Sequence, residues 1–252
     1  MNRSYVAILF FAFLMFATSM PITCLAQKTK PTVEPNVLPQ DDFKKYGIYG
    51  NTAPRPRKVP VVETRLPLEL QPGNRIALIG NTLLDRSQHF GFLESLLHQR
   101  YPKHQLIIRH LAWSADTPDL QPRPANFADL EQHLTHEKID VIIAAFGFNE
   151  SFQGEGGLET FRQHLSQLTS NLKGKSFNGH TAPRIVLISP IANENIRGIN
   201  AADLNNKRIK QYSEAIRSVS QNQGVGFVDV FSGTQKAMEQ PGTSLTFNGC
   251  HL

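Results

Sequence analysis

The sequence contains very little cysteine, and this limits how the folded protein can be stabilised. Only two cysteines occur among its 252 residues, Cys24 and Cys250. Cys24 falls in a stretch with the features of a removable leader, so Cys250 is left as a single thiol and no internal disulfide is possible. No Cys/His cluster has the spacing of a zinc site. We therefore expect a fold held by its hydrophobic core, without a metal or other cofactor.

Several signatures of other enzyme classes are also missing. The chain has no Gly-rich phosphate loop and no dinucleotide-binding fingerprint, which argues against kinases and dehydrogenases on similar sheets. No serine lies in a Gly-x-Ser-x-Gly elbow, so an α/β-hydrolase is not supported. The net charge is +5, but the basic residues are scattered and do not alternate with aromatic residues. No nucleic-acid partner is therefore expected.

Long apolar runs are absent except at the N-terminus. Residues 1–26 have a basic start at Arg3, an apolar core over residues 6–17 and a small-residue cleavage site at Cys24-Leu25-Ala26, the layout of a secretory signal peptide. We predict a secreted or periplasmic bacterial protein. An uncleaved N-terminal membrane anchor is the alternative, because the apolar run is near the lower length limit for a span.

The rest of the chain divides by composition. Residues 27–73 hold half of the prolines and little apolar periodicity, which predicts a Pro-rich linker or a wrapped extension. Residues 74–252 form the predicted domain. There, short apolar runs alternate with helical patterns, giving strands at 76–79, 105–110, 141–146, 184–189 and 226–230 and helices at 84–100, 126–137 (capped by Asn126), 157–173 and 201–222.

This alternation predicts an α/β fold. Five strands separated by helices imply a three-layer, doubly wound, flavodoxin-like parallel sheet in the order 2-1-3-4-5. The sequence ends one residue after His251, so the domain is expected to lack its last helix.

Four short motifs follow the predicted strands, on the edge of the sheet where ligands bind. They are Gly80-Asn81-Thr82-Leu83, Ala112-Trp113-Ser114-Ala115-Asp116, Gly147-Phe148-Asn149-Glu150 and Asn248-Gly249-Cys250-His251. In this order they resemble the four blocks of the SGNH, or GDSL-type, hydrolases. The first block, with Gly-Asn-Thr-Leu in place of Gly-Asp-Ser-Leu, is similar to a variant branch found among exported bacterial proteins.

The resemblance implies acyl transfer from an ester to water. Thr82 would be the nucleophile and His251 its general base. The oxyanion would be bound by the backbone N–H groups of Thr82 and Ala112 and by the side-chain amide of Asn149. Asn248 stands where the family has the aspartate that orients the histidine. The extra methyl of threonine crowds the attack, and asparagine is a weaker partner than a carboxylate, so reduced activity is expected.

Each residue also has a simpler explanation. Thr82 can cap the following helix, Asn149 can stabilise a turn, and His251 can be a frayed terminal residue. Asp85 and His89, four residues apart, are expected to be a charge pair on the helix surface.

The sequence therefore predicts an exported SGNH-like esterase for small acyl or acetyl esters, including esters on carbohydrates. The alternative is a catalytically weak or inactive module of the same fold, in which Asn81, Asn149 and Asn248 hold a glycan or a protein partner without cleaving it. A third hypothesis is a nonfunctional fragment of a longer protein.

Overall fold

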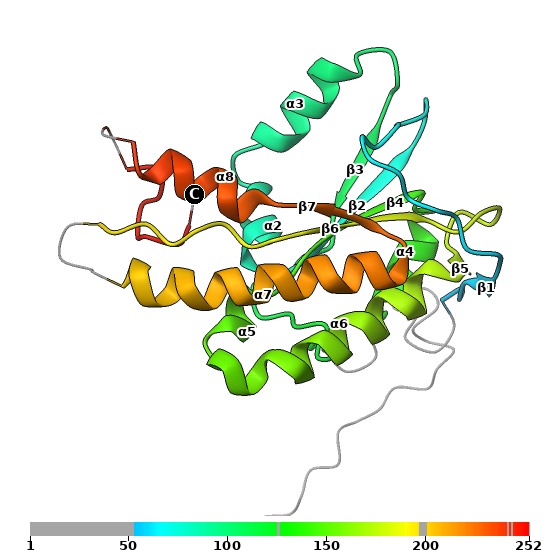
Figure 1. The fold of residues 1–252 in the computed structure, drawn as a ribbon. Helices are drawn as coiled ribbons and strands as arrows, with labels where there is room; N and C mark the ends of the chain where they lie inside the picture. The colour runs from blue at the N-terminus through cyan, green and yellow to red at the C-terminus, as the bar shows by residue number, and fades with distance from the viewer. Residues whose placement is uncertain (1–52, 125–126, 197–200, 241, 243, 252) are drawn as a thin grey trace, which may run out of the picture. The chain divides into compact units, whose positions relative to one another are not determined.

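A computed structural model describes residues 53–124, 127–196, 201–240, 242 and 244–251 (Figure 1). The predicted signal peptide, most of the predicted linker and the predicted helix cap Asn126 lie outside these residues. Within the described part of the chain, no helix combines the length and apolar character needed to cross a membrane.

The centre of the domain is a parallel sheet of five strands. The strands are β2 (Arg75–Gly80), β3 (Ile107–His110), β4 (Val141–Ala145), β6 (Arg184–Ile188) and β7 (Gly226–Val228). They lie in the order β3-β2-β4-β6-β7, and every neighbouring pair is parallel. The predicted strand order 2-1-3-4-5 and the doubly wound α/β class are confirmed.

Successive side chains of β2 point to opposite faces of the sheet and pack into two separate cores. Ala77 and Ile79 face a cluster built from α6 (Leu158–Lys173) and α7 (Ala202–Gln223), whereas Ile76 and Leu78 face the opposite side. Both sides are covered, so the strand is apolar throughout, as expected for a central parallel strand. Figure 1 shows the resulting three layers, with α6 and α7 on one face of the sheet and α2 (Thr82–Ser87), α3 (Phe92–Arg100) and α8 (Val230–Met238) on the other.

The prediction of one continuous helix over residues 84–100 is wrong. Two helices occupy the segment, α2 and α3, and residues 88–91 turn the chain between them. Gly91 has φ +65°, a left-handed conformation that glycine adopts without steric cost. Phe92 and Leu96 are exposed. The apolar residues of this segment are therefore spaced as in a helix but do not form one continuous buried face.

One further helix starts at a different residue from the prediction, and one helix is additional. Helix α4 (Leu130–His136) begins after Asp129, whose side chain accepts a hydrogen bond from Gln132 N–H at 2.9 Å. Helix α8 was not predicted. Strand β7 ends at Val228, and Asp229 then caps α8 by accepting the Ser232 N–H at 2.9 Å. In both cases an aspartate, a favourable N-cap residue, marks the start of the helix. The remaining short helices are α5 (Phe148–Ser151) and η1 (Gly154–Gly157).

The segment before β2 packs against the domain. Strand β1 (Arg57–Lys58) pairs antiparallel with β5 (Lys175–Ser176). Further along, the buried Thr64 hydroxyl oxygen accepts a hydrogen bond from the Ile185 N–H of β6 at 2.9 Å, and Leu70 joins the core on the α2 face.

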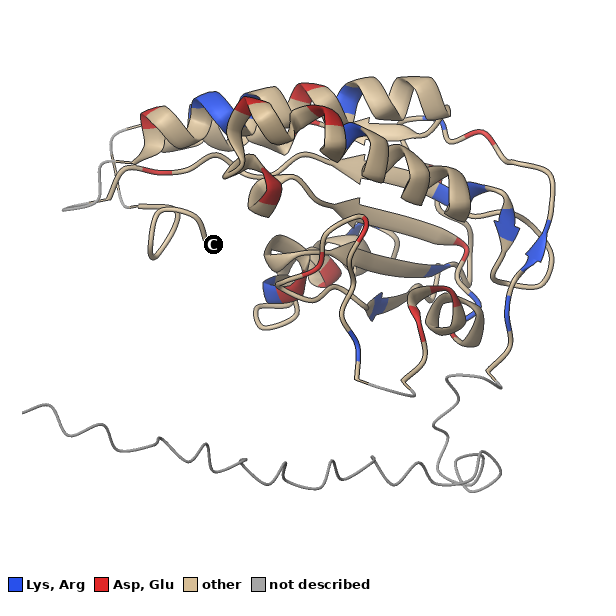
Figure 2. Cartoon of the chain, turned by 90° about the horizontal axis from the view of Figure 1, so that it is seen from below, with Lys and Arg blue, Asp and Glu red and all other residues tan. Residues whose placement is uncertain are grey.

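Charged residues lie mainly on the helices and at strand ends. In the view of Figure 2, basic and acidic residues are interspersed and the middle of the sheet carries no charge. Glu137, which follows α4, is paired with two strands at once: its Oε2 lies 3.0 Å from Arg75 Nη2 and 2.6 Å from Arg109 Nε. The two arginines hold the pKa of this carboxyl below its usual value, although burial acts in the opposite direction and is the largest single influence.

Candidate active site

The turn after β2 is fixed by its glycine. Gly80 has φ +122°, and a Cβ atom at this position would lie 2.0 Å from the carbonyl oxygen of Ala145 on β4. Hydrogen bonds of 3.0 Å tie the turn to β4, from Asn81 N–H to Ala145 O, and to the loop after β3, from Trp113 N–H to Gly80 O. Only glycine fits here, and it directs the next residues to the carboxyl edge of the sheet.

Thr82 is the first residue of α2 and does not cap it. The N-cap is Asn81, whose backbone carbonyl accepts the N–H groups of Leu84 and Asp85 and whose buried side chain makes no capping hydrogen bond. The Thr82 hydroxyl instead donates to the carbonyl oxygen of Ser114 at 3.2 Å. The capping explanation for Thr82 is therefore wrong.

The carbonyl of Ser114 brings two predicted site residues together. It accepts the Thr82 hydroxyl and also the side-chain amide of Asn149, whose Nδ2 lies 3.0 Å away. Asn149 thus uses its side chain in a long-range contact rather than in its own turn. A side-chain amide has two N–H donors, so one remains for another acceptor.

Asn149 is positioned by a short helix that a buried acid anchors. Gly147 has φ +102° and precedes α5, and its N–H donates to Glu150 Oε2 at 2.8 Å. Burial raises the pKa of Glu150 to about 7. Its second oxygen, Oε1, is buried without a hydrogen-bond partner among the described residues. Glu150 therefore tethers the turn that presents Asn149, at a cost when it is ionised.

His251 is held by Asn248. The Oδ1 atom of Asn248 accepts the backbone N–H of His251 at 3.0 Å and lies 3.0 Å from its ring Nδ1, while Nδ2 of the same amide lies 2.8 Å from Nδ1. Because one amide presents both an acceptor and a donor to Nδ1, these contacts fit either tautomer. In the tautomer with its proton on Nδ1, Oδ1 accepts that proton and Nε2 is the basic nitrogen. The description of His251 as a frayed end does not fit this arrangement.

The segment that carries His251 is anchored by residues outside the four sequence motifs. The carbonyl of Gly249, at φ +91°, accepts Glu194 N–H at 2.7 Å and Asn193 Nδ2 at 2.8 Å. The Glu194 carboxylate in turn accepts the backbone N–H and hydroxyl of Thr246 at 2.8 and 2.6 Å. These contacts join residues more than 50 positions apart in the sequence, and no local sequence pattern signals them.

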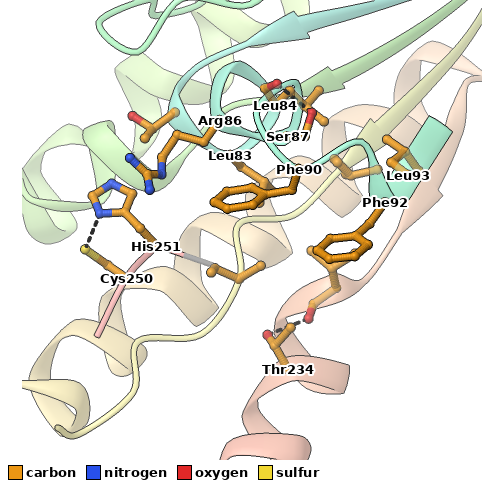
Figure 3. Close-up of a pocket in the computed structure, with 14 residues that line it drawn as sticks. Leu83, Leu84, Arg86, Ser87, Phe90, Phe92, Leu93, Thr234, Cys250 and His251 are labelled. Atoms are coloured by element: carbon orange, nitrogen blue, oxygen red, sulfur yellow. Dashed lines mark hydrogen bonds between the residues drawn. The ribbon is translucent and has the colours of Figure 1, made fainter. Parts of the chain in front are cut away.

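The electrostatics favour a neutral imidazole. Burial, followed by the nearby Arg86 cation, lowers the pKa of His251. Figure 3 shows the Arg86 side chain beside the imidazole ring. Arg86 also lies over the ring of Phe247, 5.3 Å from its centroid. A neutral histidine can accept a proton, but the imidazolium that forms is disfavoured by the same arginine.

Thr82 and His251 line the same cavity, which has a volume of about 310 Å³. Its walls are mostly apolar and include Leu83, Phe90 and Leu93 (Figure 3). Among the described residues, no hydrogen bond joins the Thr82 hydroxyl to His251. The structure thus places the alcohol and the imidazole on one cavity without a hydrogen bond between them.

Ala112, the third predicted oxyanion donor, is buried and lines a different cavity together with Trp113 and Ser114. The predicted pair of Asp85 and His89 does not form, because α2 ends at Ser87; Asp85 instead accepts the Ser114 hydroxyl. In the described residues, no three His, Cys, Asp or Glu side chains are grouped to hold a metal ion.

Comparisons with solved structures show the same fold. A catalytic mutant of Axe2, an acetylxylan esterase from Geobacillus stearothermophilus, has a TM-score of 0.58 and 17% sequence identity, covering 73% of this chain and 89% of its own. The unmutated Axe2 has a TM-score of 0.54 at 17% identity, covering 69% and 83%. BT4096, a gut microbial diltiazem-metabolizing enzyme, has a TM-score of 0.54 at 18% identity, covering 75% of this chain and 45% of its own.

No curated protein sequence matches the chain. A family model, however, matches residues 80–252, a span that begins at the glycine of the β2 turn and contains all four motifs of the carboxyl edge. The chain therefore belongs to the GDSL-like Lipase/Acylhydrolase family.

Proposed function

We propose that the protein hydrolyses carboxylic esters of small acyl groups, with acetylated carbohydrates as the substrate class. The observation that carries this proposal is the convergence of Thr82 and Asn149 on the Ser114 carbonyl, with His251 on the cavity that Thr82 also lines. An alcohol, an amide donor and a base are thus gathered at one edge of the sheet. The acetylxylan esterases among the structural neighbours support an acetylated xylo-oligosaccharide as the first substrate to test.

The proposed reaction begins with attack of Thr82 Oγ1 on the ester carbonyl carbon while His251 Nε2 takes the hydroxyl proton. The Thr82 hydroxyl must first leave its hydrogen bond with Ser114. The oxyanion then accepts the second N–H of Asn149 and the backbone N–H of Thr82. The latter lies in the first turn of α2, where amides have no intrahelical partner.

The tetrahedral intermediate collapses by breaking the bond to the alcohol, which leaves with the proton from His251. A water molecule then attacks the acyl-threonine, with His251 again taking a proton, and releases the carboxylic acid and the free Thr82 hydroxyl. The apolar walls of the cavity suit the acyl carbon atoms. The predicted signal peptide supports action outside the cytoplasm.

A second candidate function is carbohydrate binding without cleavage. Three observations argue against rapid hydrolysis. The Thr82 hydroxyl donates to Ser114 and not to His251, the histidine is oriented by an amide, and burial and Arg86 both disfavour its protonated form. All three would slow proton transfer from threonine.

Hydrolysis of p-nitrophenyl acetate by the full chain separates the two functions. We expect Thr82→Ala and His251→Ala each to reduce kcat/KM at least a hundredfold. Thr135→Ala on α4 and His180→Ala in the loop before β6 are matched controls and should stay within twofold of the parent protein. If the parent and all four variants hydrolyse no faster than buffer, the esterase proposal is wrong.

A further inference from the structure

A second cavity lies at the same edge of the sheet. It has a volume of about 590 Å³ and is lined by Asp85, Gln88, His110, Trp113 and Ser114, among others. Unlike the apolar cavity beside His251, it combines an aromatic ring with carboxylate, amide, imidazole and hydroxyl groups. We call it the Trp113 cavity.

Trp113 is the only tryptophan in the chain, and 48% of it is exposed. Its backbone N–H is tied to Gly80 O, and the guanidinium of Arg123 lies over its ring, 4.5 Å from the centroid. Arg123 is itself fixed by two hydrogen bonds of 2.8 Å to the buried carboxylate of Asp116. Trp113 lines the cavity and Arg123 does not, so the guanidinium supports the indole from outside the lining while the indole contributes an aromatic ring to it.

Polar groups line the same cavity. Each carboxylate oxygen of Asp85 accepts one hydrogen bond, Oδ1 from Gln88 Nε2 at 3.1 Å and Oδ2 from the Ser114 hydroxyl. Each oxygen therefore retains a second lone pair as an acceptor. His110 also lines the cavity, and its Nδ1 is buried without a hydrogen-bond partner among the described residues. A rigid aromatic plane with clustered acceptors and donors matches a ligand that has apolar ring faces and a rim of hydroxyl groups.

We propose that the Trp113 cavity binds a pyranose ring, which stacks on Trp113 and donates hydroxyl hydrogen bonds to Asp85. The cavity adjoins the candidate nucleophile through two links. Asp85 lies one turn after Thr82 on α2, and Ser114 contacts Asp85 with its hydroxyl and Thr82 with its carbonyl. A sugar held here would present a neighbouring ester to Thr82. This placement of the ester rests on the proposed function, whereas binding of the sugar does not.

Because Trp113 is the sole tryptophan, its fluorescence reports the proposed contact directly. We expect titration of the full chain with xylotetraose to give a saturable change in tryptophan emission, and calorimetry to give the same Kd. Trp113→Ala should weaken the calorimetric Kd at least tenfold, Trp113→Phe by less, and Asp85→Asn severalfold. Phe127→Ala, which removes another exposed aromatic ring, is the matched control and should leave Kd within twofold. Circular dichroism checks that each variant is folded.

The outcomes separate this inference from the esterase proposal. No fluorescence change and no heat with millimolar xylotetraose would overturn the sugar site, whether or not p-nitrophenyl acetate is hydrolysed. Equal Kd values for Trp113→Ala and the parent protein would also overturn it. Tight binding that requires Trp113, in a protein that hydrolyses no ester, would support the sugar site and contradict only the esterase function.

Discussion

The buried acid Glu150 should make the stability of this protein depend on pH. Its pKa in the folded protein is raised by burial from an ordinary value of 4.5 to about 7. The folded state therefore binds this proton more tightly than the unfolded state does. Stability contributed by the neutral acid is fully present below pH 4.5 and is lost as the pH rises through about 7.

The size of the effect follows from the two pKa values. At about 1.36 kcal/mol for each pH unit between them, ionisation of Glu150 costs about 3 kcal/mol of unfolding free energy at pH 8. Glu150→Gln keeps an acceptor for the Gly147 N–H and removes the charge. We expect the variant to be more stable than the parent protein at pH 8 by roughly 2–3 kcal/mol and to differ little from it at pH 4.5.

Urea unfolding of the full chain, followed by circular dichroism at several pH values, measures this difference. Glu159→Gln, on the exposed side of α6, is the matched control and should change the unfolding free energy by less than about 0.5 kcal/mol at any pH. If Glu150→Gln shows the same loss of stability with rising pH as the parent protein, Glu150 does not ionise in the folded state as argued.

Three further substitutions test other parts of the structure. Asn248→Asp places a carboxylate against the imidazole, so kcat for p-nitrophenyl acetate should rise at least tenfold; an unchanged kcat would contradict the orienting role of Asn248. Gly80→Ala brings a methyl carbon to 2.0 Å from a carbonyl oxygen at φ +122°, so the melting temperature should fall by more than 10 °C, roughly 3 kcal/mol or more. A variant with the parent's melting temperature would refute the steric argument. Arg123→Met leaves the buried Asp116 carboxylate unpaired and should reduce the unfolding free energy by roughly 3–5 kcal/mol. Adding Asp116→Leu should restore part of this loss. An Arg123→Met variant as stable as the parent would show that the ion pair is dispensable.

The fold was predictable because each central strand is a short run of apolar residues that can be recognised in the sequence. The run over Ile76–Ile79 is apolar on both faces and ends at a glycine, and Val141–Ala145 repeats the pattern. Such runs followed by helical spacing admit few arrangements other than a parallel sheet with crossover helices. The break at Gly91 was missed because leucines at helical spacing continue across it, although one of them, Leu96, is exposed.

The motifs that form the site were predictable from the sequence, but the contacts between their residues were not. The sequence showed which loops reach the carboxyl edge, because parallel strands all end there. It did not show that the Ser114 carbonyl would bind both Thr82 and Asn149, since a backbone oxygen has the same chemistry in every residue. The anchoring of Gly249 by Asn193 likewise depends on a backbone oxygen, which accepts the side-chain amide of a residue far away in the sequence.

The hydrogen bond between Thr64 and the Ile185 amide affects how a mutagenesis screen of this protein should be interpreted. A substitution at Thr64 deprives a buried strand amide of its acceptor, although the residue lies in the segment before the sheet and has no candidate role in chemistry. Colonies selected for loss of the proposed esterase activity would include such substitutions, because a larger fraction of the protein would be unfolded and degraded. Each inactive clone therefore needs a measurement of its folded amount before its residue is assigned to the reaction.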